Sequence, residues 1–284
     1  MSLAKQREDV LTELPRLPHV AAKLNEALAN PDISLREVSA IIETDPALSA
    51  RLVRMANSPL VSAGRPVKSV MYAVALMGLA EVRHMVLALS VMNCAGPIPT
   101  AALKQWATHS MATANRAASL SRRQLATQPL GWARFAGMMH ASGQLIRWRM
   151  DPKMAASIWE YQLGNPVPFA QAEEAQGAEA EGRLGAWLAW EWGLPEELAE
   201  ICIGHAAPDP SIRCERVSTG HMSRVIATAS ATAELVMLDP PPERQQPWLE
   251  RISELQANMD GPDMALWLDE ARAVVSEARA SARG

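Results

Sequence analysis

Helical periodicity is the property of this 284-residue sequence that most constrains its fold. Alanine and leucine are abundant, whereas phenylalanine and tyrosine number only two each, so strand-forming residues other than valine are scarce. Apolar residues recur at helical spacing, as in Leu35, Val38, Ile41 and Ile42. The sequence therefore predicts an all-α protein, folded as a multi-helix bundle.

Capping residues predict several helix boundaries. Ser34 and Glu37 have the spacing of a capping box, and Ser69 has the position of an N-cap for a helix over residues 70–77. Farther along, the apolar pattern predicts one continuous helix over residues 132–149 and another over residues 172–192.

Proline-rich breaks predict the domain organisation. The break Gly96-Pro97-Ile98-Pro99 separates an N-terminal lobe, about residues 10–95, from a helical lobe, about residues 100–238. Together these lobes are expected to form one domain, residues 10–238. Residues 239–242 contain three successive prolines, so the amphipathic segments of residues 239–284 are expected to form a C-terminal helical extension. That extension either packs on the bundle or offers a surface to a partner.

Charge is distributed unevenly along the chain. Residues 46–150 contain twelve Lys or Arg and a single acid, Glu81, although the whole chain carries a formal charge of −4. This basic segment either packs beside the acidic C-terminal half or recruits an anionic ligand, such as a cyclic dinucleotide or a nucleic acid. The candidate anion-binding residues are Arg122, Arg123, Arg147 and Arg149. DNA is an unlikely partner, because the run of residues 58–68 is longer than the turn of a helix-turn-helix.

The expected location is the cytoplasm. Residues 67–92 form the longest apolar stretch, but charged residues interrupt it, so no membrane span is expected. Cys94, Cys202 and Cys214 form no CxxC pair, which favours a reducing compartment over a disulfide framework. The sequence contains no Gly-rich phosphate loop, GxSxG elbow or HExxH motif, and no cofactor is expected.

The segment Met139-His140-Ala141-Ser142-Gly143-Gln144, together with other strings in order, is similar to the HDOD domain, the "HD-related output domain" of bacterial signalling proteins. The resemblance covers roughly residues 10–235. In chain order the other strings are Leu14-Pro15-Arg16-Leu17-Pro18, Asn30-Pro31-Asp32, Thr44-Asp45-Pro46-Ala47-Leu48, Arg54-Met55-Ala56-Asn57-Ser58-Pro59, Arg65-Pro66-Val67, Ala73-Val74-Ala75-Leu76-Met77-Gly78, His109-Ser110, Ala136-Gly137-Met138-Met139-His140, Leu184-Gly185-Ala186-Trp187-Leu188 and Trp192-Gly193-Leu194-Pro195.

This resemblance implies a metal site that has lost its carboxylates. The HD relatives are metal-dependent phosphohydrolases whose ligands include two histidines, an aspartate after the second histidine, and a distal aspartate. Ala141 stands at the motif aspartate and Ser230 at the distal one, while Gln144 replaces the usual lysine. The vestigial positions are therefore His109, His140, Ala141, Glu181, His205 and Ser230.

Without carboxylates the hydrolase chemistry loses its usual Mg²⁺, Mn²⁺ or Fe ligands. We therefore expect no catalytic residue and no bound metal, but a non-catalytic signal-transduction module that regulates other signalling proteins by direct contact. A phosphohydrolase that uses the histidines and Glu181 as unusual ligands is the first alternative, and the anionic-ligand binder is the second. The tryptophans near residues 148–192 either fill the core or form a stacking platform for a base.

Overall fold

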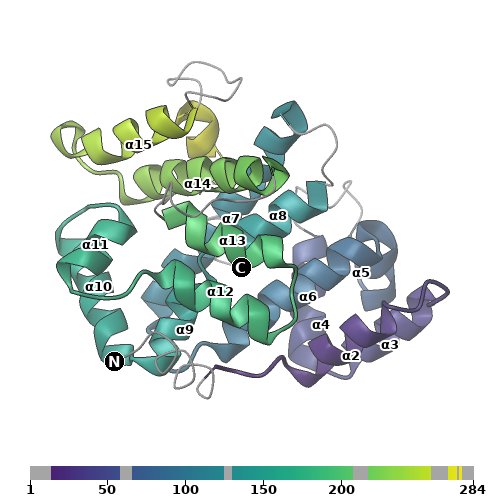
Figure 1. The fold of residues 1–284 in the computed structure, drawn as a ribbon. Coiled ribbons are helices and arrows are strands. Elements are labelled where there is room, and N and C mark those ends of the chain that lie inside the picture. Colours follow the sequence, from purple (N-terminus) through teal and green to yellow (C-terminus); the bar gives the residue numbers. More distant parts are fainter. Residues whose placement is uncertain are drawn as a thin grey trace. The chain divides into compact units, whose positions relative to one another are not determined.

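The computed structural model describes residues 14–57, 66–124, 130–206, 217–256, 268–273 and 275–276 (Figure 1). Within these ranges every regular element is a helix and none is a strand, so the all-α prediction is confirmed. Contacts within the chain define two compact units. One unit comprises residues 16–93, and the other comprises residues 94–284 together with residues 1–15.

The described part of residues 16–93 forms five helices, three of which begin at a side-chain cap. In the predicted capping box the Ser34 Oγ accepts the Glu37 N–H at 3.2 Å, while the Glu37 carboxylate accepts the Ser34 N–H at 2.9 Å. Ser69 Oγ accepts the Tyr72 N–H at 3.2 Å, as predicted. The helices are α2 (His19–Ala27), α3 (Leu35–Glu43), α4 (Pro46–Ala56), α5 (Val70–Met77) and α6 (Leu79–Cys94).

The unit of residues 94–284 contains the remaining helices and holds the candidate site. Helix α14 packs against α7, α13 and α15, and Figure 1 shows α15 running beside it. The helices are α7 (Thr100–Gln124), α8 (Leu130–Met139), α9 (Ser142–Met150), α10 (Pro152–Gly164), α11 (Phe169–Ala175), α12 (Glu181–Glu191), α13 (Glu196–Ala206), α14 (Val217–Leu238), the 3₁₀ turn η1 (Pro242–Arg244) and α15 (Gln246–Gln256).

The prediction of one helix over residues 132–149 is wrong. The chain forms α8 and α9 instead, separated by a turn at His140 and Ala141. The apolar pattern runs through both helices and therefore gave no sign of the turn. Trp106 Nε1 on α7 donates a hydrogen bond of 2.7 Å to the Ala141 carbonyl. This carbonyl lies at the turn between the two helices and is therefore still hydrogen-bonded.

The prediction of one helix over residues 172–192 is also wrong. Helix α11 ends at Ala175 and α12 begins at Glu181. Gly177, between them, has a φ of +67°, a left-handed conformation that ends the first helix. The Glu181 N–H at the start of α12 donates to the Glu173 carboxylate at 2.9 Å, so the break places two buried acids side by side.

No single helix in the described ranges is long and apolar enough to span a membrane. Helices α5 and α6 reach that length and composition only as a pair, and they are bent by 117° at their junction.

The C-terminal helix α15 packs on the helices of its own unit. Trp248 and Ile252 are fully buried and contact Ala231 and Leu235 of α14. Of the two possibilities for residues 239–284, packing on the bundle therefore holds for α15. Met259 and the other residues of 257–267 lie outside the described part of the chain.

We predict that Ile252→Ala lowers the free energy of unfolding by about 2–5 kcal/mol, because a fully buried side chain leaves a cavity between α14 and α15. Urea denaturation followed by circular dichroism would measure the change. Leu163→Ala on α10, where the side chain is 52% exposed, is the matched control and should change the value by less than about 1 kcal/mol. An unchanged unfolding transition for Ile252→Ala would contradict packing of α15 on the unit.

Candidate functional site

Three of the vestigial positions meet in one hydrogen-bonded group. His109 lies on α7, His140 in the turn after α8, and Ser230 on α14. The Nε2 atoms of His109 and His140 are 3.0 Å apart, and Ser230 Oγ lies 3.1 Å from His140 Nε2 and 3.3 Å from His109 Nε2. Residues separated by up to 121 positions therefore converge at one point.

The backbone fixes the tautomer of His140. Its Nδ1 lies 2.7 Å from the Gly137 carbonyl, which can only accept, so Nδ1 carries a proton. In the neutral ring Nε2 is then an acceptor. The Ser230 hydroxyl can donate to His140 Nε2 and accept the Nε2–H of His109, which satisfies all three groups without a net charge.

Both histidines of this group are held in the neutral form. Burial is the main cause and the neighbouring His205 is the second, and together they bring the pKa of His109 and of His140 well below the ordinary value. The two rings are also close, with centroids 5.0 Å apart, so a proton on one disfavours a proton on the other. At neutral pH the pair is uncharged.

His205 and Glu181 form a second pair beside this group. His205 Nδ1 donates to the Cys202 carbonyl at 2.7 Å, and Nε2 lies 3.0 Å from the buried Glu181 Oε1. Two acceptor atoms at that distance would repel, so one proton lies between them, on either the ring or the carboxyl group. The His205 ring also meets His140 edge-on, with centroids 4.7 Å apart, which joins the two pairs.

Glu173 and Arg147 form a further pair beside Glu181. Arg147 Nη2 donates to Glu173 Oε1 at 2.8 Å and also to the Glu179 carbonyl. Burial and the neighbouring Glu181 raise the pKa of Glu173, whereas the hydrogen bonds from Arg147 and from the Glu181 N–H oppose that rise by favouring the carboxylate. The buried charges of this region thus balance one another through direct contacts.

The side chains present do not fit the metal centre of the HD hydrolases. Ala141 is fully buried and presents a methyl group, and Ser230 presents a hydroxyl already within hydrogen-bonding distance of both histidines. In the described part of the chain no three His, Cys, Asp or Glu residues are arranged to hold one metal ion. His205 Nε2 faces Glu181 rather than the other imidazoles.

Of the four candidate anion-binding arginines, the three whose side chains are described do not form one patch of free cations. Arg147 is buried and paired with Glu173, whereas Arg149, two residues later on α9, is exposed. Arg122 is exposed near the end of α7, and the Arg123 side chain lies outside the described part of the structure.

The tryptophans differ in their surroundings. Trp192 is buried and donates from Nε1 to the Pro15 carbonyl at 2.8 Å, while Trp190 is 43% exposed. Trp148 and Trp159, by contrast, line a cavity that His109 also borders, together with Trp106.

Sequence reasoning missed the polar residues of that cavity. Gln105 precedes His109 by four residues on α7, and Glu234 follows Ser230 by four residues on α14. A spacing of four places such pairs on the same helix face, so this signal was present once the vestigial positions were assigned. Gln162 on α10 carries no comparable signal in the sequence.

We predict that Gly143→Ala destabilises the protein severely, because a Cβ at this position would overlap the Glu181 carbonyl and approach its carboxylate. The expected loss in the free energy of unfolding is about 3 kcal/mol or more. Thermal and urea denaturation would measure it. Gly164→Ala on α10 is the matched control, because no atom lies within 4 Å of its added Cβ. Equal stability of the two variants would exclude the close approach of α9 and α12.

We predict that stability falls as the pH drops below about 6.5. Because the folded-state pKa of His109 and His140 is lowered, unfolding takes up protons in this range, and each histidine contributes about 1.4 kcal/mol per pH unit. His109→Gln should therefore flatten the decline between pH 7 and pH 5, as measured by urea denaturation at several pH values. His19→Gln, at an exposed position on α2, should keep the wild-type slope; identical slopes in all three proteins would refute the neutral pair.

Comparisons with known proteins agree with this architecture. The HDOD domain family model matches residues 14–208. An HDOD domain protein of unknown function from Geobacter sulfurreducens is 23% identical, with a TM-score of 0.69 and 98% of each chain covered. A protein from Shewanella amazonensis SB2B described as a candidate phosphohydrolase is 23% identical, with a TM-score of 0.70 and 97% of each chain covered. At such identities the likeness establishes the fold alone.

Two further similarities involve longer proteins. A candidate signal transduction protein from Marinobacter aquaeolei VT8 is 20% identical, with a TM-score of 0.68, and the match covers 97% of this chain but 59% of that one. An uncharacterised protein of Treponema pallidum (strain Nichols) is 22% identical over 203 residues, which are 72% of this chain and 39% of that protein. The chain thus spans about two fifths of the length of this curated relative. Since the family model covers well over half of the sequence, the chain belongs to the HDOD domain family.

Proposed function

We propose that this chain is a non-catalytic signal-transduction module that regulates other signalling proteins through direct contact. One observation carries the proposal: Ala141 and Ser230 occupy the two positions where an HD hydrolase needs carboxylates, and Ser230 is hydrogen-bonded into a neutral histidine pair. The two histidines are held neutral and the neighbouring Arg147 and Glu173 are in direct contact, which favours a structural role over chemistry. We also propose a cytoplasmic location, in keeping with the unpaired, buried Cys94 and Cys202.

The electrostatics of the site support this proposal over hydrolysis. Attack on a phosphoester needs a cationic centre that activates water and neutralises the phosphate charge. The described side chains here supply two neutral imidazoles, a proton shared by His205 and Glu181, and an arginine committed to Glu173. None of these groups offers a free positive charge to a phosphate.

The experiment is a joint measurement of metal content and phosphodiester hydrolysis. We expect purified protein to contain less than stoichiometric Zn, Mn and Fe by mass spectrometry, and bis(p-nitrophenyl) phosphate to remain intact when Mn²⁺ or Mg²⁺ is added. Stoichiometric metal that is lost in both His109→Ala and His140→Ala would overturn the proposal in favour of a hydrolase with unusual ligands.

The partner is tested separately, by affinity capture from the native host followed by mass spectrometry. We expect signalling proteins to be enriched by the wild-type chain and not by a chain unfolded by Gly143→Ala. Capture of nucleic acid, or salt-sensitive binding of a cyclic dinucleotide in calorimetry, would instead favour the anionic-ligand alternative.

A further inference from the structure

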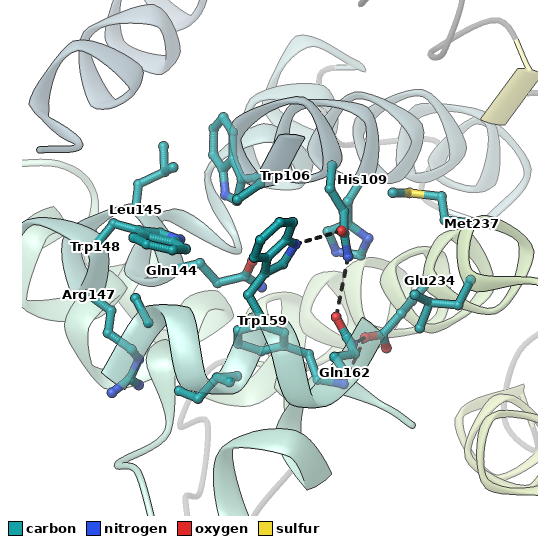
Figure 2. A pocket seen from close by; sticks show the side chains of 16 residues that line it. Trp106, His109, Gln144, Leu145, Arg147, Trp148, Trp159, Gln162, Glu234 and Met237 are labelled. Carbon is teal, nitrogen blue, oxygen red and sulfur yellow. Dashed lines mark hydrogen bonds between the residues drawn. The ribbon is translucent and has the colours of Figure 1, made fainter. Parts of the chain in front are cut away.

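A cavity beside the histidine pair is walled by aromatic side chains. It lies within the unit of residues 94–284, between α7, α9, α10 and α14, and Figure 2 shows its lining. Trp106, Trp148, Trp159 and Phe169 form the aromatic part of the wall. The cavity has a volume of about 50 Å³, which is room for several waters, since one water needs about 10–15 Å³.

A chain of hydrogen bonds holds this wall in place. Trp159 Nε1 donates to Gln105 Oε1 at 2.9 Å, and the Gln105 amide donates to Gln162 Oε1 at 3.4 Å. Gln162 Nε2 in turn donates to Glu234 Oε1 at 2.7 Å. The indole and both amides are therefore fixed before any ligand enters, which lowers the entropic cost of binding.

The chain ends on a carboxylate that faces the cavity. Glu234 accepts three N–H groups, from Gln162, from the Phe169 backbone at 2.7 Å and from Trp248 Nε1 at 3.1 Å. Burial raises the pKa of Glu234, but all three partners are donors, and a protonated acid would need an acceptor. The geometry thus fits the ionised form.

Among the described residues, no cationic side chain is in direct contact with the negative charge of Glu234. Among the described residues no cationic group lies within 4 Å of the Glu234 carboxylate, although Arg251 is near enough to favour its charge. Arg147 also lines the cavity, but Glu173 already pairs with it at 2.8 Å. An anionic ligand would meet Glu234 without a free cation to offset the repulsion.

One polar group of the wall remains available to a ligand. The Gln144 side chain extends between Trp148 and Trp159 in Figure 2, and its amide makes no hydrogen bond with any described residue. Its carbonyl can accept a bond from an N–H or O–H group. Aromatic faces, a hydrogen-bonded carboxylate with no described cation within 4 Å, and a free acceptor form a combination suited to a small organic cation.

We propose that this cavity binds the methylated or primary ammonium head of a small organic amine, with Glu234 supplying the charge and the indoles of Trp106, Trp148 and Trp159 surrounding the cation. The proposal goes beyond the signalling role, because such binding is independent of which proteins the module contacts. An ammonium group of about five heavy atoms matches the enclosed space, while the rest of the amine extends toward the open side.

The first test compares a cation with its neutral isostere on the wild-type chain. Calorimetric titration with choline should give a dissociation constant of roughly 0.1–1 mM, and 3,3-dimethylbutan-1-ol, which replaces N⁺ by carbon, should bind at least about tenfold more weakly. Binding should weaken as the pH falls and Glu234 becomes protonated. Equal affinity for the two probes, no binding of choline, tetramethylammonium or methylamine, or tighter binding of AMP than of choline would each overturn the proposal.

The second test locates the site. Glu234→Gln and Trp148→Leu should each weaken choline binding by about tenfold or more, since they remove the charge and one aromatic face. The matched controls are Glu191→Gln and Trp190→Leu, at exposed positions on α12, and both should retain wild-type affinity. Circular dichroism establishes whether each variant is folded. If Glu234→Gln unfolds, Trp148→Leu and the comparison of choline with its neutral isostere still decide whether the cavity binds the cation. Wild-type affinity in folded Glu234→Gln would refute the assigned site.

Discussion

The turn at His140 and Ala141 is the constraint on which the rest of the larger unit depends. It ends α8 and starts α9, and it is held by the bond from Trp106 to the Ala141 carbonyl. Just after the turn Gly143 packs against the backbone of Glu181 so closely that no side chain fits. A single stretch of four residues, 140–143, thereby brings α7, α9 and α12 into contact and places His140 beside Ser230.

Around this turn, hydrogen bonds between neutral side chains take the place of attraction between charges. In a metal centre a cation would hold the converging ligands together, whereas here the Ser230 hydroxyl links two neutral rings. Neutral groups carry a smaller desolvation cost than charges, and each finds a partner. The charges that are buried nearby, on Arg147 and Glu173, are in direct contact with each other, which is the condition under which buried charges persist.

The same helices that carry the histidine group also build the cavity. Gln105 and Trp106 lie one helical turn before His109 on α7, and Glu234 lies one turn after Ser230 on α14. The two features therefore lie next to each other on the same two helices.

The sequence by itself determined the helical class and the Ser34 and Ser69 caps, because these depend on local periodicity and local hydrogen bonds. The positions of the lost carboxylates follow from the resemblance to the HD relatives. Only the tertiary structure decided the break at residues 140–141, because it is stabilised by Trp106, which lies 35 residues away in the chain. The break at residues 176–180 has a local signal in Gly177, whose φ of +67° ends α11. Only the tertiary structure decided the burial of Arg147 and the contact between Gln162 and Glu234, which lie 72 residues apart. Long-range packing selects such contacts, and no local pattern encodes them.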